Sequence, residues 1–245
     1  MSRPGTLLPH DAWNQKLVES VHPPGWRNPE PASRYDLVVL GAGTAGLVSA
    51  AVSAGLGARV ALVERHLMGG DCLNVGCVPS KTLIRAARAA ADVRDARRFG
   101  VQVPDGVGVD FAAVMERVRR VRAEIAPHDS AQRFASLGVD VFLGEGRFTG
   151  PQVLEVAGAA LRFKRAVVAT GARAVALPIP GLAEAGFLTN ETVFELEQRP
   201  SRLAAVSRCH FPSRGRRTDG SSFVPTGSES STSRSSSISS PEAKL

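Results

Sequence analysis

Short apolar runs alternate with longer amphipathic segments along the first two thirds of the chain, and this alternation predicts an α/β fold. The runs YDLVVL (35–40), RVALVE (59–64) and VDVFLG (139–144) are nearly all apolar, which is typical of buried parallel strands. A fourth run, AVVAT (166–170), is expected to return to the same sheet. Because segments with helical periodicity lie between these runs, we expect a mostly parallel sheet with helices packed on it.

The N-terminal segment contains one expected helix, from residue 11 to residue 21. Its apolar residues recur every four positions, and Asp11 can cap its first turn. We expect this helix to dock on the main domain. The apolar stripe that would make the contact consists of Trp13, Leu17 and Val21.

Two long helices are expected in the middle of the chain. The first, 79–98, is rich in alanine and arginine and should end at Gly100. The second, 110–126, should bury an apolar stripe and turn its arginines to solvent, and His128 and Asp129 after it have the character of capping residues. The stripe is Val114, Val118, Val121 and Ile125, and the arginines are Arg117, Arg119, Arg120 and Arg122.

Alternating apolar and polar residues predict a small antiparallel meander before the last apolar run. Its expected strands, 153–156 and 161–164, are separated by Gly158. A proline- and glycine-rich stretch, PIPGL (178–182), then leaves the domain.

A glycine-rich turn, GAGTAG (41–46), directly follows the first apolar run and matches G-x-G-x-x-G. In this pattern the first glycine permits a tight turn, the second lets backbone N–H groups approach a pyrophosphate, and the third lets helix and strand pack closely. Glu64 ends the next run, where a carboxylate can accept hydrogen bonds from a ribose hydroxyl. The order of strand, turn, helix, strand and acid favours dinucleotide binding over a turn with only a structural role.

Two of the three cysteines, Cys72 and Cys77, lie in the segment GGDCLNVGCVPSK. A regular helix would separate their Cα atoms by roughly 8 to 9 Å, and cysteines more than about 7 Å apart cannot be bridged. A disulfide would therefore need an irregular helix start, for which Asn74 and Gly76 tolerate unusual backbone angles. A redox pair is favoured over zinc because the segment offers two ligands and a structural site needs four. Two unrelated buried thiols are the alternative, and Lys81, one helical turn beyond Cys77, either faces the same ligand or is an ordinary exposed lysine.

Composition narrows the function classes. A chain of 245 residues with 43% hydrophobic and 5% aromatic residues fits an Ala/Val/Leu-rich α/β protein. The net charge of +7 comes mostly from scattered arginines without interleaved aromatic residues, so nucleic-acid binding is not expected. Three cysteines make no disulfide framework, which favours a reducing, cytoplasmic compartment. No secretory signal, membrane span or metal site is predicted.

The glycine turn, Glu64 and the cysteine segment together resemble the class I FAD-dependent pyridine nucleotide-disulfide oxidoreductases, which include dihydrolipoamide dehydrogenase, glutathione reductase and mercuric reductase. The resemblance extends through GEGRFTG (144–150) and VVATGAR (167–173) and covers roughly residues 34–200. The VPSK ending and the opening NPEPASRYDLVVLGAGTAGL are most similar to mercuric reductase, although Asp71 stands where a threonine is usual. The resemblance implies a Rossmann-like FAD-binding domain with a parallel sheet and a small antiparallel meander.

The resemblance also implies how FAD is held. Its pyrophosphate would lie on the glycine turn and its adenosine ribose on Glu64. Gly146 or Arg147 would contact the adenine through the backbone, and Thr170 and Gly171 would line the flavin side. The residues implied to contact the cofactor are Gly41, Gly43, Thr44, Ala45, Gly46, Glu64, Arg65, Gly70, Asp71, Cys72, Lys81, Gly146, Arg147, Thr170 and Gly171.

The same resemblance assigns the redox roles. Cys77 would be the charge-transfer thiol next to the flavin, Cys72 the interchange thiol that attacks the substrate, and Lys81 a neighbour of flavin N5. Electrons would pass from NAD(P)H to flavin, to the Cys72–Cys77 disulfide and then to a substrate, which is left open among a disulfide, dihydrolipoamide and mercuric ion.

The family pattern breaks near residue 200. SRLAAVS (201–207) begins like the first strand of an NAD(P)H domain, but Ser/Arg-rich sequence replaces the expected glycine turn. We therefore expect an N-terminal extension (1–33), a partial FAD-binding domain (34–200) and a disordered tail (201–245) in which Cys209 and His210 are not catalytic.

We expect that the chain is truncated. One hypothesis is that its tail is read out of frame. The NAD(P)H site and the domain through which the family homodimerises would then be missing. Two functions are compatible with this organisation: the FAD and redox-disulfide portion of an oxidoreductase, or a non-catalytic FAD-binding fragment or pseudoenzyme that leaves apolar surface uncovered.

Overall fold

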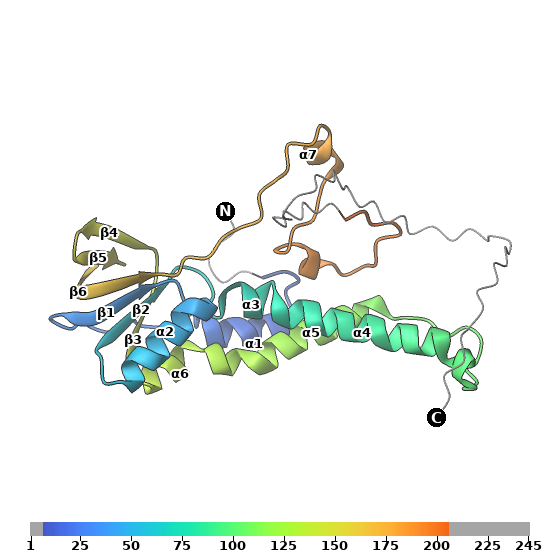
Figure 1. Ribbon diagram of the computed structural model, residues 1–245, viewed down its shortest axis with the longest axis horizontal. Helices are drawn as coiled ribbons and strands as arrows, with labels where there is room; N and C mark the ends of the chain where they lie inside the picture. Colours follow the sequence, from blue (N-terminus) through green and yellow to red (C-terminus); the bar gives the residue numbers. More distant parts are fainter. Residues whose placement is uncertain (1–6, 206–245) are drawn as a thin grey trace, which may run out of the picture. The chain divides into compact units, whose positions relative to one another are not determined.

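The computed structural model describes residues 7–205, and Figure 1 labels its helices and strands. The chain divides into two compact units, Met1–Arg199 and Pro200–Leu245. The sheet, the helices and both cysteines of the candidate redox pair belong to the first unit. Our predictions for the tail from residue 206 onward, including those for Cys209 and His210, lie outside the described residues.

A six-stranded mixed sheet, ordered β3-β2-β1-β6-β5-β4, forms the centre of the unit and confirms the expected α/β class. Strands β3, β2, β1 and β6 are parallel, and β6, β5 and β4 form the antiparallel meander. The strands are β1 (Tyr35–Leu40), β2 (Val60–Glu64), β3 (Val139–Leu143), β4 (Gly146–Gly150), β5 (Val153–Val156) and β6 (Ala159–Val168).

Strand β6 differs from the prediction. We expected separate strands at 161–164 and 166–170, but β6 is continuous and belongs to both parts of the sheet. Its first residues pair antiparallel with β5, and its later residues pair in parallel with β1, from Tyr35 opposite Phe163 to Leu40 opposite Val168. Lys164 interrupts the apolar pattern but is exposed, so a polar side chain does not break the strand. Strand β4 was not predicted.

Most helices begin and end near the expected residues, and Asp11 is the helix cap that was predicted. Asp11 accepts a hydrogen bond from the Asn14 backbone N–H at 2.8 Å, and Asp110 accepts one from Ala113 at 3.0 Å. The long middle helix starts two residues earlier than predicted, and Gly100 ends its terminal 3₁₀ turn with φ of 75°. The α-helices are α1 (Ala12–Val21), α2 (Thr44–Gly55), α3 (Gly70–Asn74), α4 (Cys77–Asp95), α5 (Phe111–Ile125), α6 (Ala131–Ser136) and α7 (Leu182–Ala185), and the 3₁₀ turns are η1 (Ala96–Phe99), η2 (Ala126–Asp129) and η3 (Val193–Glu195).

The core lies on both faces of the parallel strands, which explains why their sequences are nearly all apolar. Val39 and Leu62 join the cluster that packs against the helices, whereas Val38 and Val63 join the cluster around Tyr35 on the opposite face. Helix α1 contributes to the first cluster and packs on α5, so the expected docking of the N-terminal helix is confirmed. Figure 1 shows α4 and α5 side by side, extending away from the sheet.

The expected solvated arginine face of α5 is wrong for two residues. Arg119 and Arg122 are only 8% and 4% exposed, because α1 and η3 lie near this part of α5. Arg119 forms an ion pair with Asp11, the N-cap residue of α1. Arg122 Nε has no hydrogen-bond partner among the described residues, and burial lowers the pKa of this guanidinium to about 10. The apolar stripe on α5 is also centred differently, with Met115, Val118 and Ala123 as its buried members.

Candidate functional site

The glycine turn lies at the carboxyl end of β1 and leads directly into α2, as predicted. Gly41 has φ of 103°, and a Cβ atom there would lie 2.3 Å from the Ala169 carbonyl oxygen. A Cβ atom on Gly46 would lie 1.8 Å from the Gly41 carbonyl oxygen. Neither position has room for a side chain, so both glycines are required by close backbone packing at the edge of the sheet.

The cysteine segment starts against this turn. Gly70 has φ of 54°, and a Cβ atom on it would lie 2.6 Å from Gly43 Cα. Next to this contact, the Gly69 N–H donates to the Ala42 carbonyl oxygen at 2.9 Å. The glycine turn and the cysteine segment therefore touch backbone to backbone. Figure 1 shows α3 between α2 and α4.

Glu64 anchors the other side of the turn. Its two carboxylate oxygens accept hydrogen bonds from the backbone N–H groups of Ala42 and His66, each at 2.7 Å. The carboxylate is partly exposed, and each oxygen has a further lone pair for a ligand hydroxyl. Its expected contact with a ribose stays a prediction, and Arg65 next to it is exposed.

The two cysteines stand on different helices, which solves the spacing problem of a regular helix. Helix α3 ends at Asn74, and α4 begins at Cys77. Gly76 lies so close to the first turn of α3 that a Cβ atom there would be 2.7 Å from the Asp71 carbonyl oxygen. The chain therefore folds back between the helices, and this brings the free Cys77 thiol close enough to raise the pKa of the free Cys72 thiol.

Asn74 does not play the part that we expected. It is helical, and its φ is not positive. Its buried side-chain amide instead donates to the carbonyl oxygens of Met68 and Gly70, at 3.1 and 2.9 Å. These bonds tie the end of α3 to the loop before it, because a short helix alone would be marginal.

The surroundings of Cys72 combine three parts of the fold. Burial first, then the Cys77 thiol and the charge of Asp129, raise the pKa of the Cys72 thiol, whereas a hydrogen bond with Thr44 lowers it. Thr44 is the first residue of α2, so the glycine turn and Cys72 meet at this side chain. Cys72 is partly buried, and Cys77 is exposed.

The remaining predicted residues lie around the same sheet edge or on exposed helix positions. Thr170 and Gly171 follow β6, and a Cβ atom on Gly41 would lie 3.1 Å from the Thr170 backbone nitrogen. A Cβ atom on Gly146 would lie 2.7 Å from Leu40 Cδ1, so this glycine packs at the end of β1. The other predicted side chains that are exposed are Thr44, Ala45, Asp71, Lys81 and Arg147.

Asp129 lies beside the candidate site at a position that the sequence did not predict. We expected it to cap a helix, but Ser130 is the N-cap residue of α6 and accepts from the Arg133 backbone N–H at 3.2 Å. The Asp129 carboxylate points elsewhere, with Oδ2 3.0 Å from the place that a Cβ atom on Gly69 would take. Burial raises the pKa of this carboxyl group. No local signal distinguishes it from a cap, because its contact lies about sixty residues earlier in the sequence.

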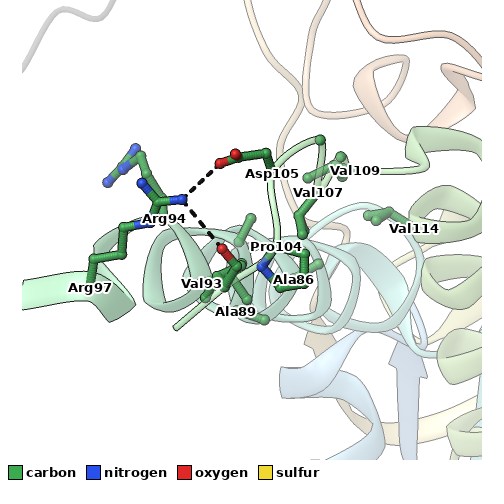
Figure 2. Close-up of a pocket in the computed structure, with 14 residues that line it drawn as sticks. Ala86, Ala89, Val93, Arg94, Arg97, Pro104, Asp105, Val107, Val109 and Val114 are labelled. Atoms are coloured by element: carbon green, nitrogen blue, oxygen red, sulfur yellow. Dashed lines mark hydrogen bonds and ion pairs between the residues drawn. The ribbon is translucent and has the colours of Figure 1, made fainter. Parts of the chain in front are cut away.

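Other features of residues 7–205 do not compete with this site. No cluster of three or more His, Cys, Asp or Glu side chains in this range could hold a metal ion, and no helix in it is long and apolar enough to cross a membrane. A groove of about 540 Å³ lies between the second half of α4 and the loop 103–109, and Figure 2 shows the side chains that line it. Small apolar side chains such as Ala89 and Val107 line it, and none of the predicted site residues does.

Comparisons with known proteins agree with the motifs. Residues 35–206 match the family model described as pyridine nucleotide-disulphide oxidoreductase. The chain is 36% identical over 172 residues to a mercuric reductase of Lysinibacillus sphaericus, a match that covers 70% of this chain and 31% of the relative. It is 36% identical over 179 residues to a dihydrolipoyl dehydrogenase of Acholeplasma laidlawii, covering 71% and 53%. It is 32% identical over 174 residues to a glutathione reductase of Burkholderia cepacia, covering 70% and 37%. The chain thus spans about a third to a half of the length of these relatives.

Proposed function

Because the chain belongs to the pyridine nucleotide-disulphide oxidoreductase family, we propose that residues 34–200 are its FAD-binding part and carry a redox-active Cys72–Cys77 pair. The single observation that carries this proposal is the contact between the two motifs. Gly43 and Gly70 touch through their backbones, and the Thr44 side chain lies close enough to Cys72 to lower the pKa of its thiol. A cofactor on the glycine turn would therefore lie beside the thiol pair.

The residues present fit a dinucleotide. The turn 41–46 has no room for side chains at Gly41 and Gly46, and Gly43 carries none, so the backbone N–H groups at Gly43 can approach a pyrophosphate. It opens the 12-residue helix α2, whose N-terminal partial positive charge favours an anionic group. Glu64 has spare acceptor capacity next to the turn for a ribose hydroxyl. When bound, FAD would carry electron pairs from NAD(P)H toward the thiol pair.

The protein's own residues account for the disulfide chemistry. In the exchange reaction, the Cys72 thiolate attacks an oxidised substrate, and a mixed disulfide forms as the substrate's leaving group departs. The Cys77 sulfur then attacks Cys72, which closes the Cys72–Cys77 disulfide and releases the reduced substrate. Cys77 stands at the first position of the 19-residue helix α4, where the helix dipole favours an anionic group. Lys81, one turn further, presents a positive charge to the same end of the helix.

A second candidate, a non-catalytic FAD-binding fragment, is favoured by the exposed apolar surface. Val48 and Val52 of α2 are 58% and 57% exposed, Leu56 at its C-cap is 84% exposed, and Val168 at the end of β6 is 64% exposed. In the full-length relatives further polypeptide is available to cover such residues, and this chain spans 31% of the first relative. By itself the chain would then bind the cofactor weakly and not turn over.

Flavin binding is the first test. The full chain is purified, saturated with FAD and dialysed, and the released flavin is counted by its absorbance. We expect close to one FAD per wild-type chain. We expect roughly ten- to hundredfold weaker binding for Glu64→Ala, since a hydrogen bond to a charged group contributes about 1.5–3 kcal/mol. Glu155→Ala, an exposed carboxylate on β5, is the matched control. Equal FAD binding by Glu64→Ala and wild type, with both folded by circular dichroism, would refute the assignment of Glu64.

Disulfide formation separates the two candidates. After mild oxidation, peptide mapping should find a Cys72–Cys77 linkage in the wild-type chain. In Cys72→Ser and in Cys77→Ser, the cysteine that remains should stay open to alkylation. A chain that binds FAD but leaves both thiols free under these conditions favours the non-catalytic fragment. A chain that forms the linkage and is oxidised and reduced repeatedly favours the oxidoreductase part.

A further inference from the structure

The carboxylate of Asp129 occupies an unusual position for an acidic side chain. It is half-buried at the end of η2, and no hydrogen bond to it is found within residues 7–205. Leaving a carboxylate partly desolvated without a hydrogen-bond donor costs folding free energy. Helix capping does not explain it, because Ser130 already performs that task for α6.

The position of this carboxylate is defined by the start of α3. Gly69 precedes α3 with φ of 87°, and Asp129 Oδ2 would be 3.0 Å from a Cβ atom at this residue. The absence of a side chain at Gly69 thus leaves space that the Leu73 side chain, 2.6 Å from the same Cβ position, and the Asp129 carboxylate both approach. Cys72 lies three residues further along, one helical turn away, so the charge of Asp129 acts on the same short helix that presents this thiol.

We propose that Asp129 is a positioning residue for the redox pair: its negative charge beside α3 disfavours a thiolate at Cys72, so that Cys72 remains the protonated member of the reduced pair. This inference rests on the proposed oxidoreductase function. The two sulfurs would then differ in protonation, because the proton on Cys72 is removed only when a substrate or a base arrives. No proton moves to Asp129 itself, and the effect is electrostatic.

The electrostatic environment supports the assignment. Asp129 is among the groups that raise the pKa of the Cys72 thiol, after burial and Cys77, and it is the only carboxylate among them. The charged groups that face Asp129 are Arg133 of α6 and His128 of η2, and both only partly offset the effect of burial on its own pKa. Perturbed titratable groups of this kind gather at functional sites.

The test measures the reactivity of one sulfur. The full chain is reduced, freed of reductant and treated with iodoacetamide between pH 6 and 10, and mass spectrometry follows alkylation of the Cys72 peptide. Asp129→Asn keeps the shape and removes the charge. We expect Cys72 to react about threefold faster at pH 7.5 in this variant, because a larger fraction of its thiol is then ionised. Asp129→Glu should react like wild type because it retains the charge.

Matched measurements separate charge from structure. Glu124→Gln removes an exposed carboxylate five residues earlier and should leave Cys72 unchanged. Unchanged or slower alkylation of Cys72 in folded Asp129→Asn would overturn the proposal, and so would equal acceleration in Asp129→Glu. FAD content is recorded for the same proteins. If FAD content equals that of wild type and the alkylation rate of Cys72 is unchanged, only the role of Asp129 is refuted. If Cys72 is alkylated faster in a chain that binds no FAD, the role of Asp129 is supported and the proposed function is refuted.

Discussion

Replacing Gly76 by alanine should push the two cysteine-bearing helices apart. An added Cβ atom would lie 2.7 Å from the Asp71 carbonyl oxygen and 3.4 Å from Cys72 Cα. Ordinary contacts begin near 3.4 Å, so the start of α4 must move away from α3 by about 0.7 Å. The atoms in the way are backbone, which cannot rotate aside. Overpacking of this kind typically costs about 1–3 kcal/mol, and the lower entropy of the unfolded alanine chain offsets only about 0.4–1 kcal/mol.

The displacement acts on the thiol pair directly, because Asp71 and Cys72 are neighbours and Cys77 follows Gly76. We therefore expect the equilibrium constant for forming the Cys72–Cys77 disulfide in a glutathione redox buffer to fall roughly tenfold, the factor that about 1.4 kcal/mol produces. Urea unfolding of the reduced protein should show a loss of about 1–2 kcal/mol.

Gly55→Ala is the matched control, since a Cβ atom there meets nothing within 4 Å and the residue is the last of α2. It should leave the disulfide equilibrium unchanged and keep or slightly raise stability. Our reasoning fails if Gly76→Ala forms the disulfide as readily as wild type. The close approach of Gly76 to α3 would then not be what brings the sulfurs together.

Three further substitutions test the packing around the site by urea unfolding. Asp11→Ala removes the cap of α1 and leaves the buried Arg119 unpaired, so it should lower the free energy of unfolding by about 3–5 kcal/mol. Asp105→Ala breaks an exposed ion pair and should lower it by less than about 1 kcal/mol. Equal losses in the two variants would contradict this prediction. Arg122→Met replaces a buried guanidinium that has an unsatisfied N–H and should leave stability unchanged or raise it by about 1 kcal/mol, whereas a large loss would show that its charge is needed. Burial raises the pKa of Asp129 in the folded state, so ionisation at neutral pH opposes folding; Asp129→Asn should be more stable than wild type at pH 7, and the difference should vanish as pH falls through the raised pKa toward the unfolded value. A difference that grows on acidification would reverse the sign of this argument.

Local patterns were sufficient for most of the secondary structure. The apolar runs became β1, β2 and β3, and Asp11, Asp110 and Gly100 mark helix ends as expected. These signals are local, because a strand buried on both faces needs a continuous apolar run, and a cap bonds to a backbone group a few residues away. The glycine turn was also predictable, since its φ value and its close contacts within residues 41–46 belong to one short segment.

Contacts between distant segments could not be predicted in the same way. We expected a break at residue 165, between strands 161–164 and 166–170, but β6 continues because two different neighbours pair with its two halves. From the spacing of apolar residues in α5, we expected Arg119 and Arg122 to face solvent. That spacing contains no information about the helix that covers them.

The amino-acid sequence by itself determined the order of strands and helices, the glycine turn and the presence of two nearby cysteines, because each depends on interactions within a few residues. Only the tertiary structure decided that Gly70 meets Gly43, that Gly76 folds α4 back onto α3, and that Asp129 lies beside Gly69. These contacts depend on which surfaces meet when the sheet and helices pack, and the free energy of a partly buried charge depends on all of its neighbours together.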